Sequence, residues 1–187
     1  MRKWLAFACG CLFLLAAGVA IYQKEQLLKH GQAVFLALAP VDPRSLMQGD
    51  YMALNFAIAN QITSEIYRRE QESKANNSSN SNDTPELAFN HDGFAVLRLD
   101  AQGVAQSVRI EPDTTTATAL APGELRLRYR WRKHRIKLST DAFFFQEGQG
   151  NRYATAKYGL FRVDSKGNAL LSDLYDGEMK VLRESTQ

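Results

Sequence analysis

Two acidic residues beside glycines are the first candidates for chemistry in this chain. Asp50 follows Gly49, and Glu147 precedes Gly148. Two carboxyl groups held close together can act as the general acid and the general base of one reaction. Aspartate and glycine are also favoured in tight turns, where glycine accepts a positive φ. We therefore interpret both pairs as turn formers and predict no catalytic residue at either position.

A nucleophilic serine is the alternative catalytic centre. Ser45 lies four residues before Gly49-Asp50. This layout resembles type I signal peptidases, which are N-terminally anchored, β-rich proteins with a serine ahead of a Gly-Asp strand start, although that family places the serine farther back. Such a serine needs a buried lysine of lowered pKa as its base, whereas Lys133 and Lys137 lie in a strongly basic stretch. A membrane-tethered hydrolase is kept as an alternative function.

Four arginines form the most charged pattern in the sequence. They alternate with apolar residues, which is typical of a half-buried strand, and the face they share consists of Arg126, Arg128, Arg130 and Arg132. This face suits lipid phosphates or an acidic partner surface. We favour the simpler alternative, in which neighbouring strands supply aspartate and glutamate.

The sequence gives little indication of metal, cofactor or nucleic-acid binding. The three histidines, His30, His91 and His134, are scattered, without a second ligand at helical or hairpin spacing. Cys9 and Cys11 both lie in the N-terminal apolar run, so the rest of the chain offers no cysteine ligand and no disulfide. The net charge of +3 is too small to indicate nucleic acid. We expect no metal, no cofactor and no nucleic-acid partner.

The N-terminus has the pattern of a membrane segment. Arg2 and Lys3 precede an uncharged apolar run from Trp4 to Ile21, whose eighteen residues span about 27 Å as a helix, close to a bilayer's hydrocarbon core. We predict a retained anchor over residues 1–22, single-pass in the inner (cytoplasmic) membrane. Because the basic residues come first, the C-terminal domain should lie in the periplasm or otherwise outside the cytoplasm. A cleaved signal peptide ending near Ala20 remains the alternative.

A polar segment and one β-rich domain follow this anchor. Residues 23–32 suit a helix that continues out of the bilayer as a juxtamembrane linker, and residues 33–187 are predicted to form the extracytoplasmic domain. A strand after Asp50 should change into a helix near Ile58. The insert at 70–86 has almost no apolar residue and is predicted to be disordered.

Period-two patterns joined by turn residues dominate the remainder. The predicted strands are 93–99, 105–110, 125–132, 135–140, 158–163 and 169–175, with a short helix within 149–157. Phe143-Phe144-Phe145 is interpreted as core, although a run of three places side chains on both faces. The predicted fold is α+β and predominantly antiparallel β, a sandwich or partly open barrel with one or two short helices.

One motif resembles a known family. Gly49-Asp50-Tyr51-x-x-Leu54-x-Phe56 is similar to the signature of the GDYXXLXY family of membrane-anchored bacterial proteins. Phe56 keeps the aromatic ring of the family's final tyrosine and loses its hydroxyl. The resemblance extends to later blocks that contain Glu147, Gly148, Tyr158, Gly159, Arg162 and Asp164. It implies an anchored domain associated with multi-pass membrane proteins, and it transfers no catalytic residue.

We therefore expect a non-catalytic binding or assembly module that contacts the bilayer through its N-terminal helix and docks onto a multi-pass membrane protein. The expected interaction residues are Gly49, Asp50, Tyr51, Leu54, Phe56, Glu147, Gly148, Tyr158, Gly159, Arg162 and Asp164. Tyr51 is the leading candidate, because Leu54 and Phe56 should anchor the motif in the core. A carrier of a small apolar ligand is a further alternative and requires a large apolar cavity.

Overall fold

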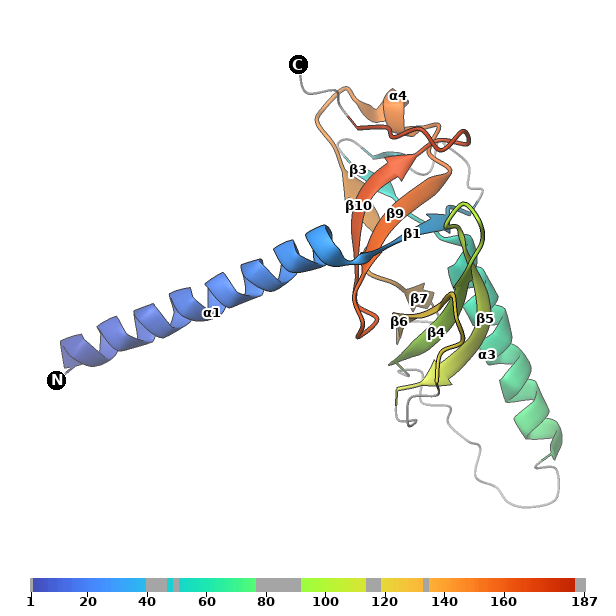
Figure 1. Ribbon diagram of the computed structural model, residues 1–187, viewed down its shortest axis with the longest axis horizontal. Helices are drawn as coiled ribbons and strands as arrows, with labels where there is room; N and C mark the ends of the chain where they lie inside the picture. Colours follow the sequence, from blue (N-terminus) through green and yellow to red (C-terminus); the bar gives the residue numbers. More distant parts are fainter. Residues whose placement is uncertain are drawn as a thin grey trace.

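The computed structural model describes residues 2–39, 47–48, 51–76, 92–113, 119–132 and 135–183. Its architecture is predominantly antiparallel β, as predicted, and one long helix projects from the body (Figure 1). In chain order the elements are α1 (Arg2–His30), β1 (Gln32–Ala37), β2 (Met47–Gln48), β3 (Tyr51–Ala53), α3 (Ala57–Asn76), β4 (Asp92–Leu99), β5 (Ala105–Pro112), β6 (Glu124–Arg132), β7 (Arg135–Lys137), β8 (Ala142–Phe144), α4 (Gly150–Tyr153), β9 (Tyr158–Val163) and β10 (Ala169–Tyr175).

The projecting helix α1 leaves its apolar side chains uncovered. Trp4, Phe13 and Ile21 are exposed, and the segment Cys9–His30 is long and apolar enough to cross a membrane, as a signal sequence also is. The helix continues through the predicted linker to His30, where Leu27 is buried against the body. The chain then enters β1 after a single residue, Gly31.

Two larger sheets form the body. β1-β9-β10 and β5-β4-β6-β7 pair antiparallel throughout. At one seam the Phe35 N–H of β1 donates to the Gly103 carbonyl beside β5, at 2.9 Å. At the other seam the Arg128 N–H of β6 donates to the Gly167 carbonyl in the β9–β10 turn, at 2.8 Å. Because the two sheets meet at both seams and curve around one core, they form a partly open barrel.

Aspartates begin the turns that connect these strands. Asp100 Oδ1 accepts the N–H groups of Gln102 and Val104 between β4 and β5. Asp164 Oδ1 accepts those of Lys166 and Asn168 between β9 and β10. Each carboxylate replaces backbone partners within its turn. The residues predicted as turns therefore form hairpins at these two positions.

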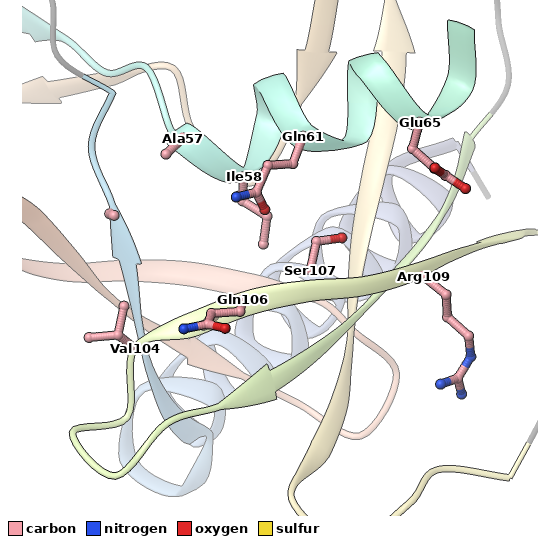
Figure 2. A pocket seen from close by; sticks show the side chains of 10 residues that line it. Ala57, Ile58, Gln61, Glu65, Val104, Gln106, Ser107 and Arg109 are labelled. Atoms are coloured by element: carbon pink, nitrogen blue, oxygen red, sulfur yellow. The ribbon is translucent and has the colours of Figure 1, made fainter. Parts of the chain in front are cut away.

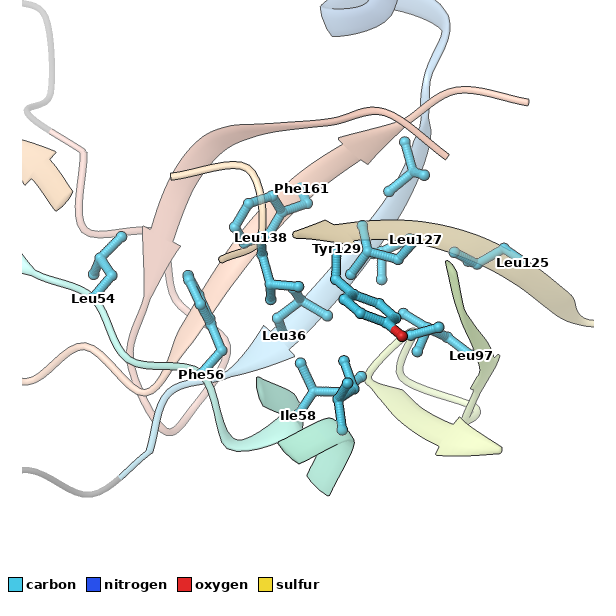
Figure 3. Close-up of a cluster of buried hydrophobic side chains, with 14 of the residues drawn as sticks. Leu36, Leu54, Phe56, Ile58, Leu97, Leu125, Leu127, Tyr129, Leu138 and Phe161 are labelled. Carbon is cyan, nitrogen blue, oxygen red and sulfur yellow. The ribbon is translucent and has the colours of Figure 1, made fainter. Parts of the chain in front are cut away.

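The core lies between the sheets and under α3. Ile58 and Ile62 of α3 are buried in this core, and Ile58 lies on the side of Tyr129 and Leu97 of the four-stranded sheet (Figure 3). Four-residue spacing places both isoleucines on one helix face, which explains why this face is covered. The remaining buried core side chains come from every sheet: Val34, Leu36, Met52, Leu54, Phe56, Ala95, Ile110, Leu125, Leu127, Leu138, Tyr153, Phe161, Val163 and Leu174.

One local prediction was wrong, and one short strand was not predicted. α3 extends through residues 70–76, which the sequence placed in a disordered insert, and the ion pair of Arg68 with Glu72 at i,i+4 spacing supports this last part of the helix. The rest of that insert lies outside the described residues. The strand that was not predicted is β2 at Met47–Gln48, and together with β8 it flanks the motif strand β3.

Candidate functional site

The motif strand β3 brings an aromatic pair to the surface. Met52 faces the core, so Tyr51 faces the opposite side of the strand. Tyr51 lies directly across from Phe144 of β8, with ring centroids 5.8 Å apart. The Phe144 side chain is 75% exposed. Tyr51 itself is half-buried, so Phe144 supplies most of the exposed surface of these two side chains, which we call the exposed aromatic pair.

Phe144 was missed by the sequence analysis, which placed it in the core. Its neighbours Phe143 and Phe145 do pack inward against the buried ring of Tyr153 in α4, at centroid distances of 5.0 and 5.3 Å. Alternation along a strand then turns the middle phenylalanine outward. The position could have been found from the run of three aromatics, had the strand direction been known.

Leu54 and Phe56, the described motif residues after Tyr51, belong to the core, whereas Gly49 and Asp50 lie outside the described residues. Phe56 is 4% exposed and meets the Phe161 ring edge-on, with centroids 5.3 Å apart. Gly159 makes this contact possible, because a Cβ there would lie 3.2 Å from the Phe161 ring and 3.5 Å from the Phe56 ring. Leu54 is buried nearby (Figure 3). The motif segment that contains Phe56 therefore packs against β9, which belongs to the later segment of the family resemblance.

Further predicted interaction residues lie in turns and at strand ends. Gly148 has φ +82 and Glu147 is exposed beside it, as a turn requires. Asp164 orders the β9–β10 turn. Tyr158 lies at the start of β9, paired across to Ala37 of β1. These residues have structural roles in turns and at strand ends, and they do not surround a common cleft.

Arg162 lies where α1 joins the body. Its guanidinium donates to the Gly31 carbonyl at 3.3 Å, and a Cβ on Gly31 would come within 3.0 Å of the Arg162 Cβ. A cation beside the last carbonyls of a helix is favourable, because those carbonyls carry partial negative charge. Arg162 therefore adds a contact between the body and the residue that follows α1.

The catalytic alternatives gain nothing from the described residues. Ser45, Gly49, Asp50 and Lys133 lie outside them, so the serine centre and the Asp50–Glu147 pair stay untested. Lys137 is exposed and forms an ion pair with Asp141, unlike the buried lysine that a serine nucleophile needs. No group of three histidine, cysteine or carboxylate side chains suited to a metal occurs among the described residues.

The arginine face of β6 is largely paired with acidic residues from β4, β5 and the turn after β5. Glu111 accepts from Arg126 Nε at 2.9 Å and from Arg109 Nε at 3.1 Å. Arg128 pairs with Asp113, and Arg132 with Asp92, each at 2.8 Å. The pairing that we favoured from the sequence is therefore present for these three members of the face.

These ion pairs cover a buried apolar residue. Val96 lies between Arg109 and Arg126 across the sheet and is 0% exposed. Burial raises the pKa of the Glu111 carboxyl, but the hydrogen bonds from Arg126 and Arg109 together lower the pKa below its ordinary value. The pKa of Glu124 is also lowered, first by the Ala121 N–H and then by Arg109. The network is therefore part of the folded structure.

Arg130 is the exception on this face. It makes no ion pair with any residue that the structure describes, and its side chain is exposed. It pairs in register with Asp92 of β4 and Lys137 of β7, but Asp92 bonds to Arg132 instead. Among the described residues, one positive charge of the face is thus left without an ion pair.

A groove between α3 and β5 is the place to look for a small ligand. It encloses about 530 Å³, and Gln61 and Glu65 of α3 line it opposite Ser107 and Arg109 of β5 (Figure 2). Its lining is mixed, because apolar side chains such as Ile58 and Val104 alternate with these polar ones, whereas a carrier needs a mostly apolar cavity. The groove lends no support to a carrier of apolar molecules.

The comparisons with known proteins agree with the motif. The family model described as GDYXXLXY protein matches residues 13–174, which includes the end of α1, the motif strand and β9. No curated protein and no solved structure matches the chain. With most of its length covered by that model, the chain belongs to the GDYXXLXY protein family.

Proposed function

We propose that this chain is a membrane-anchored binding or assembly module that docks onto a multi-pass membrane protein through the exposed aromatic pair. The observation that carries this proposal is Phe144, which is 75% exposed beside the signature tyrosine Tyr51. Aromatic side chains dominate the binding energy of protein interfaces, because they bury large areas with few rotatable bonds. A surface phenylalanine held on a short strand is suited to that role.

The rigidity of the pair also supports docking. β3 is fixed from below by Met52, Leu54 and Phe56, and the Leu54 N–H donates to the Asp141 carbonyl at 2.8 Å. β8 is fixed by Phe143 and Phe145 against Tyr153. Side chains that are already ordered lose less entropy when a partner covers them. In this proposal the signature acts to present Tyr51 rather than to catalyse a reaction.

We propose that α1 is a membrane anchor because its large apolar side chains are exposed. Soluble proteins rarely leave a row of large apolar side chains in water, and a bilayer would cover them. Arg2 and Lys3 before the apolar run favour an orientation with the body outside the cytoplasm, in the periplasm of a bacterium with two membranes. A multi-pass partner in the same bilayer would meet the body near the membrane surface.

Site-specific photocrosslinking in intact membranes tests the proposal. A photoreactive aromatic residue at position 144 should crosslink to an integral membrane protein, and Tyr51→Ala in the same chain should reduce the yield at least fivefold. The matched control carries the photoreactive residue at Gln71, which is exposed on α3. Equal crosslinking from positions 71 and 144, or no integral membrane protein at 144, would contradict the proposal.

A further inference from the structure

A pocket beside the end of α1 gathers positive charge from two distant parts of the chain. It encloses about 400 Å³ and is lined by Lys24 of α1, by Arg128 and Arg130 of β6, and by Asp92 of β4. The β9–β10 turn closes one side through Asn168. We call Lys24, Arg128 and Arg130 the cation pocket.

The charges in this pocket do not cancel. The acidic residue that lines the pocket, Asp92, forms an ion pair with Arg132 at 2.8 Å. Arg128 pairs with Asp113, whereas Lys24 and Arg130 form no ion pair within the described part of the chain. Lys24 and Arg130 therefore leave about two positive charges facing one small volume.

The pocket lies at a defined height on α1. The uncharged run ends at Ile21, and Lys24 follows three residues later, about 4.5 Å farther along the helix axis. The headgroup layer on each side of a bilayer is about 5–7 Å thick, from the difference between the hydrocarbon core and the whole membrane. If α1 spans the bilayer with its apolar run in the core, Lys24 reaches the level of the lipid phosphates.

A second groove also borders α1, from Tyr22 to the end of the helix. Tyr22 of α1 and Leu120 from the segment before β6 line one groove together, and the Leu120 side chain is 40% exposed. Tyrosine is enriched at the boundary between acyl chains and headgroups. The groove thus brings an exposed apolar side chain of the body to the same side of α1 as Tyr22, which suits a body held close to the membrane surface.

We propose that the cation pocket binds the phosphate of an anionic phospholipid headgroup. Guanidinium groups bind phosphate oxygens through two parallel hydrogen bonds, and an ammonium group adds a point charge beside them. The phosphate would take the place of the carboxylate that Arg130 lacks. This inference rests on the anchored part of the proposed function, because α1 must cross the bilayer, but it does not depend on the docking partner.

The test uses the full chain in a non-ionic detergent, titrated with phosphatidylglycerol or with zwitterionic phosphatidylcholine. Binding is read from the thermal unfolding midpoint. The wild-type chain should bind phosphatidylglycerol at least tenfold more tightly than phosphatidylcholine, and Lys24→Gln/Arg130→Gln should lose that preference. The matched control, Arg152→Gln/Lys180→Gln, removes two exposed cations elsewhere and should keep it.

Two outcomes would overturn the inference. One is an equal response of wild-type chain and pocket variant to phosphatidylglycerol. The other is saturation by millimolar inorganic phosphate alone, which would identify a free anion as the ligand. Photocrosslinking from position 144 in the pocket variant separates this inference from the proposed docking. In the pocket variant, lost lipid preference with retained crosslinking is the expected result. In the wild-type chain, crosslinking without a preference for phosphatidylglycerol would overturn the lipid site alone, and preference without crosslinking would overturn docking alone.

Discussion

Replacing Glu111 with glutamine tests whether the ion-pair network over Val96 stabilises the domain. Glu111→Gln keeps the size of the side chain and removes its charge. The carboxylate accepts from Arg109 and Arg126, but Arg109 retains Glu124 at 3.0 Å, so the change weakens mainly the bond to Arg126 Nε. A hydrogen bond to a charged, largely buried group contributes about 1–3 kcal/mol. We expect a loss of that size at pH 7.

The effect should depend on pH in one direction. The pKa of the Glu111 carboxyl is lower in the folded protein than its ordinary value. Its stabilising contribution is therefore fully present above the unfolded pKa and disappears as the pH falls through the folded pKa. Wild type and Glu111→Gln should differ by about 2–12 °C in Tm at pH 7. Their Tm values should converge as the pH falls toward 3.

The measurement is thermal unfolding of the full chain, followed by the fluorescence of Trp131, which is buried in β6. Glu178→Gln removes the charge of an exposed glutamate and serves as the control, with an expected change within about 1 °C. An equal Tm for wild type and Glu111→Gln at pH 7 would refute the stabilising role. A difference that persists unchanged at pH 3 would show that packing, rather than charge, is lost.

The remaining predictions concern the motif and the helix junction. Phe56→Ala should lower the free energy of unfolding by about 3–5 kcal/mol, whereas Phe144→Ala should change it by less than about 0.5 kcal/mol, as measured by urea unfolding; similar losses for both would contradict the assignment of one to core and the other to surface. Gly31→Ala should speed amide hydrogen exchange around the end of α1 without changing exchange in β4, because a Cβ would lie 2.5 Å from the Leu27 carbonyl. Unchanged exchange at that junction would mean that the backbone adapts to a side chain there.

Local patterns predicted most strands because each depends on near neighbours. The alternation from Leu125 to Trp131 places four apolar side chains on one face of β6, and aspartate-led turns specify the hairpins. β2 and β8 were missed because they are two and three residues long, too short for a period to be recognised. Their formation depends on pairing with β3, a contact between segments distant in sequence.

The candidate site was predictable only in part, for the same reason. Tyr51 could be assigned to the side of its strand away from the core, since Met52 and Leu54 determine the inward face. Its neighbour Phe144 is more than ninety residues away in the chain. The unpaired state of Arg130 depends on which acidic side chains β4 and β5 supply, and register across three strands decides that.

The junction between α1 and β1 has a mechanical consequence. Only Gly31 separates the helix from the strand, and Arg162 holds that residue from β9. With a connection this short, we expect the helix and the body to tilt together. Membrane helices tilt by about 20° on average, and such a tilt would displace the exposed aromatic pair by about a third of its distance from the pivot. If α1 spans a bilayer, the interfacial residues and neighbouring helices that set its tilt would thereby change how far the domain reaches across the surface.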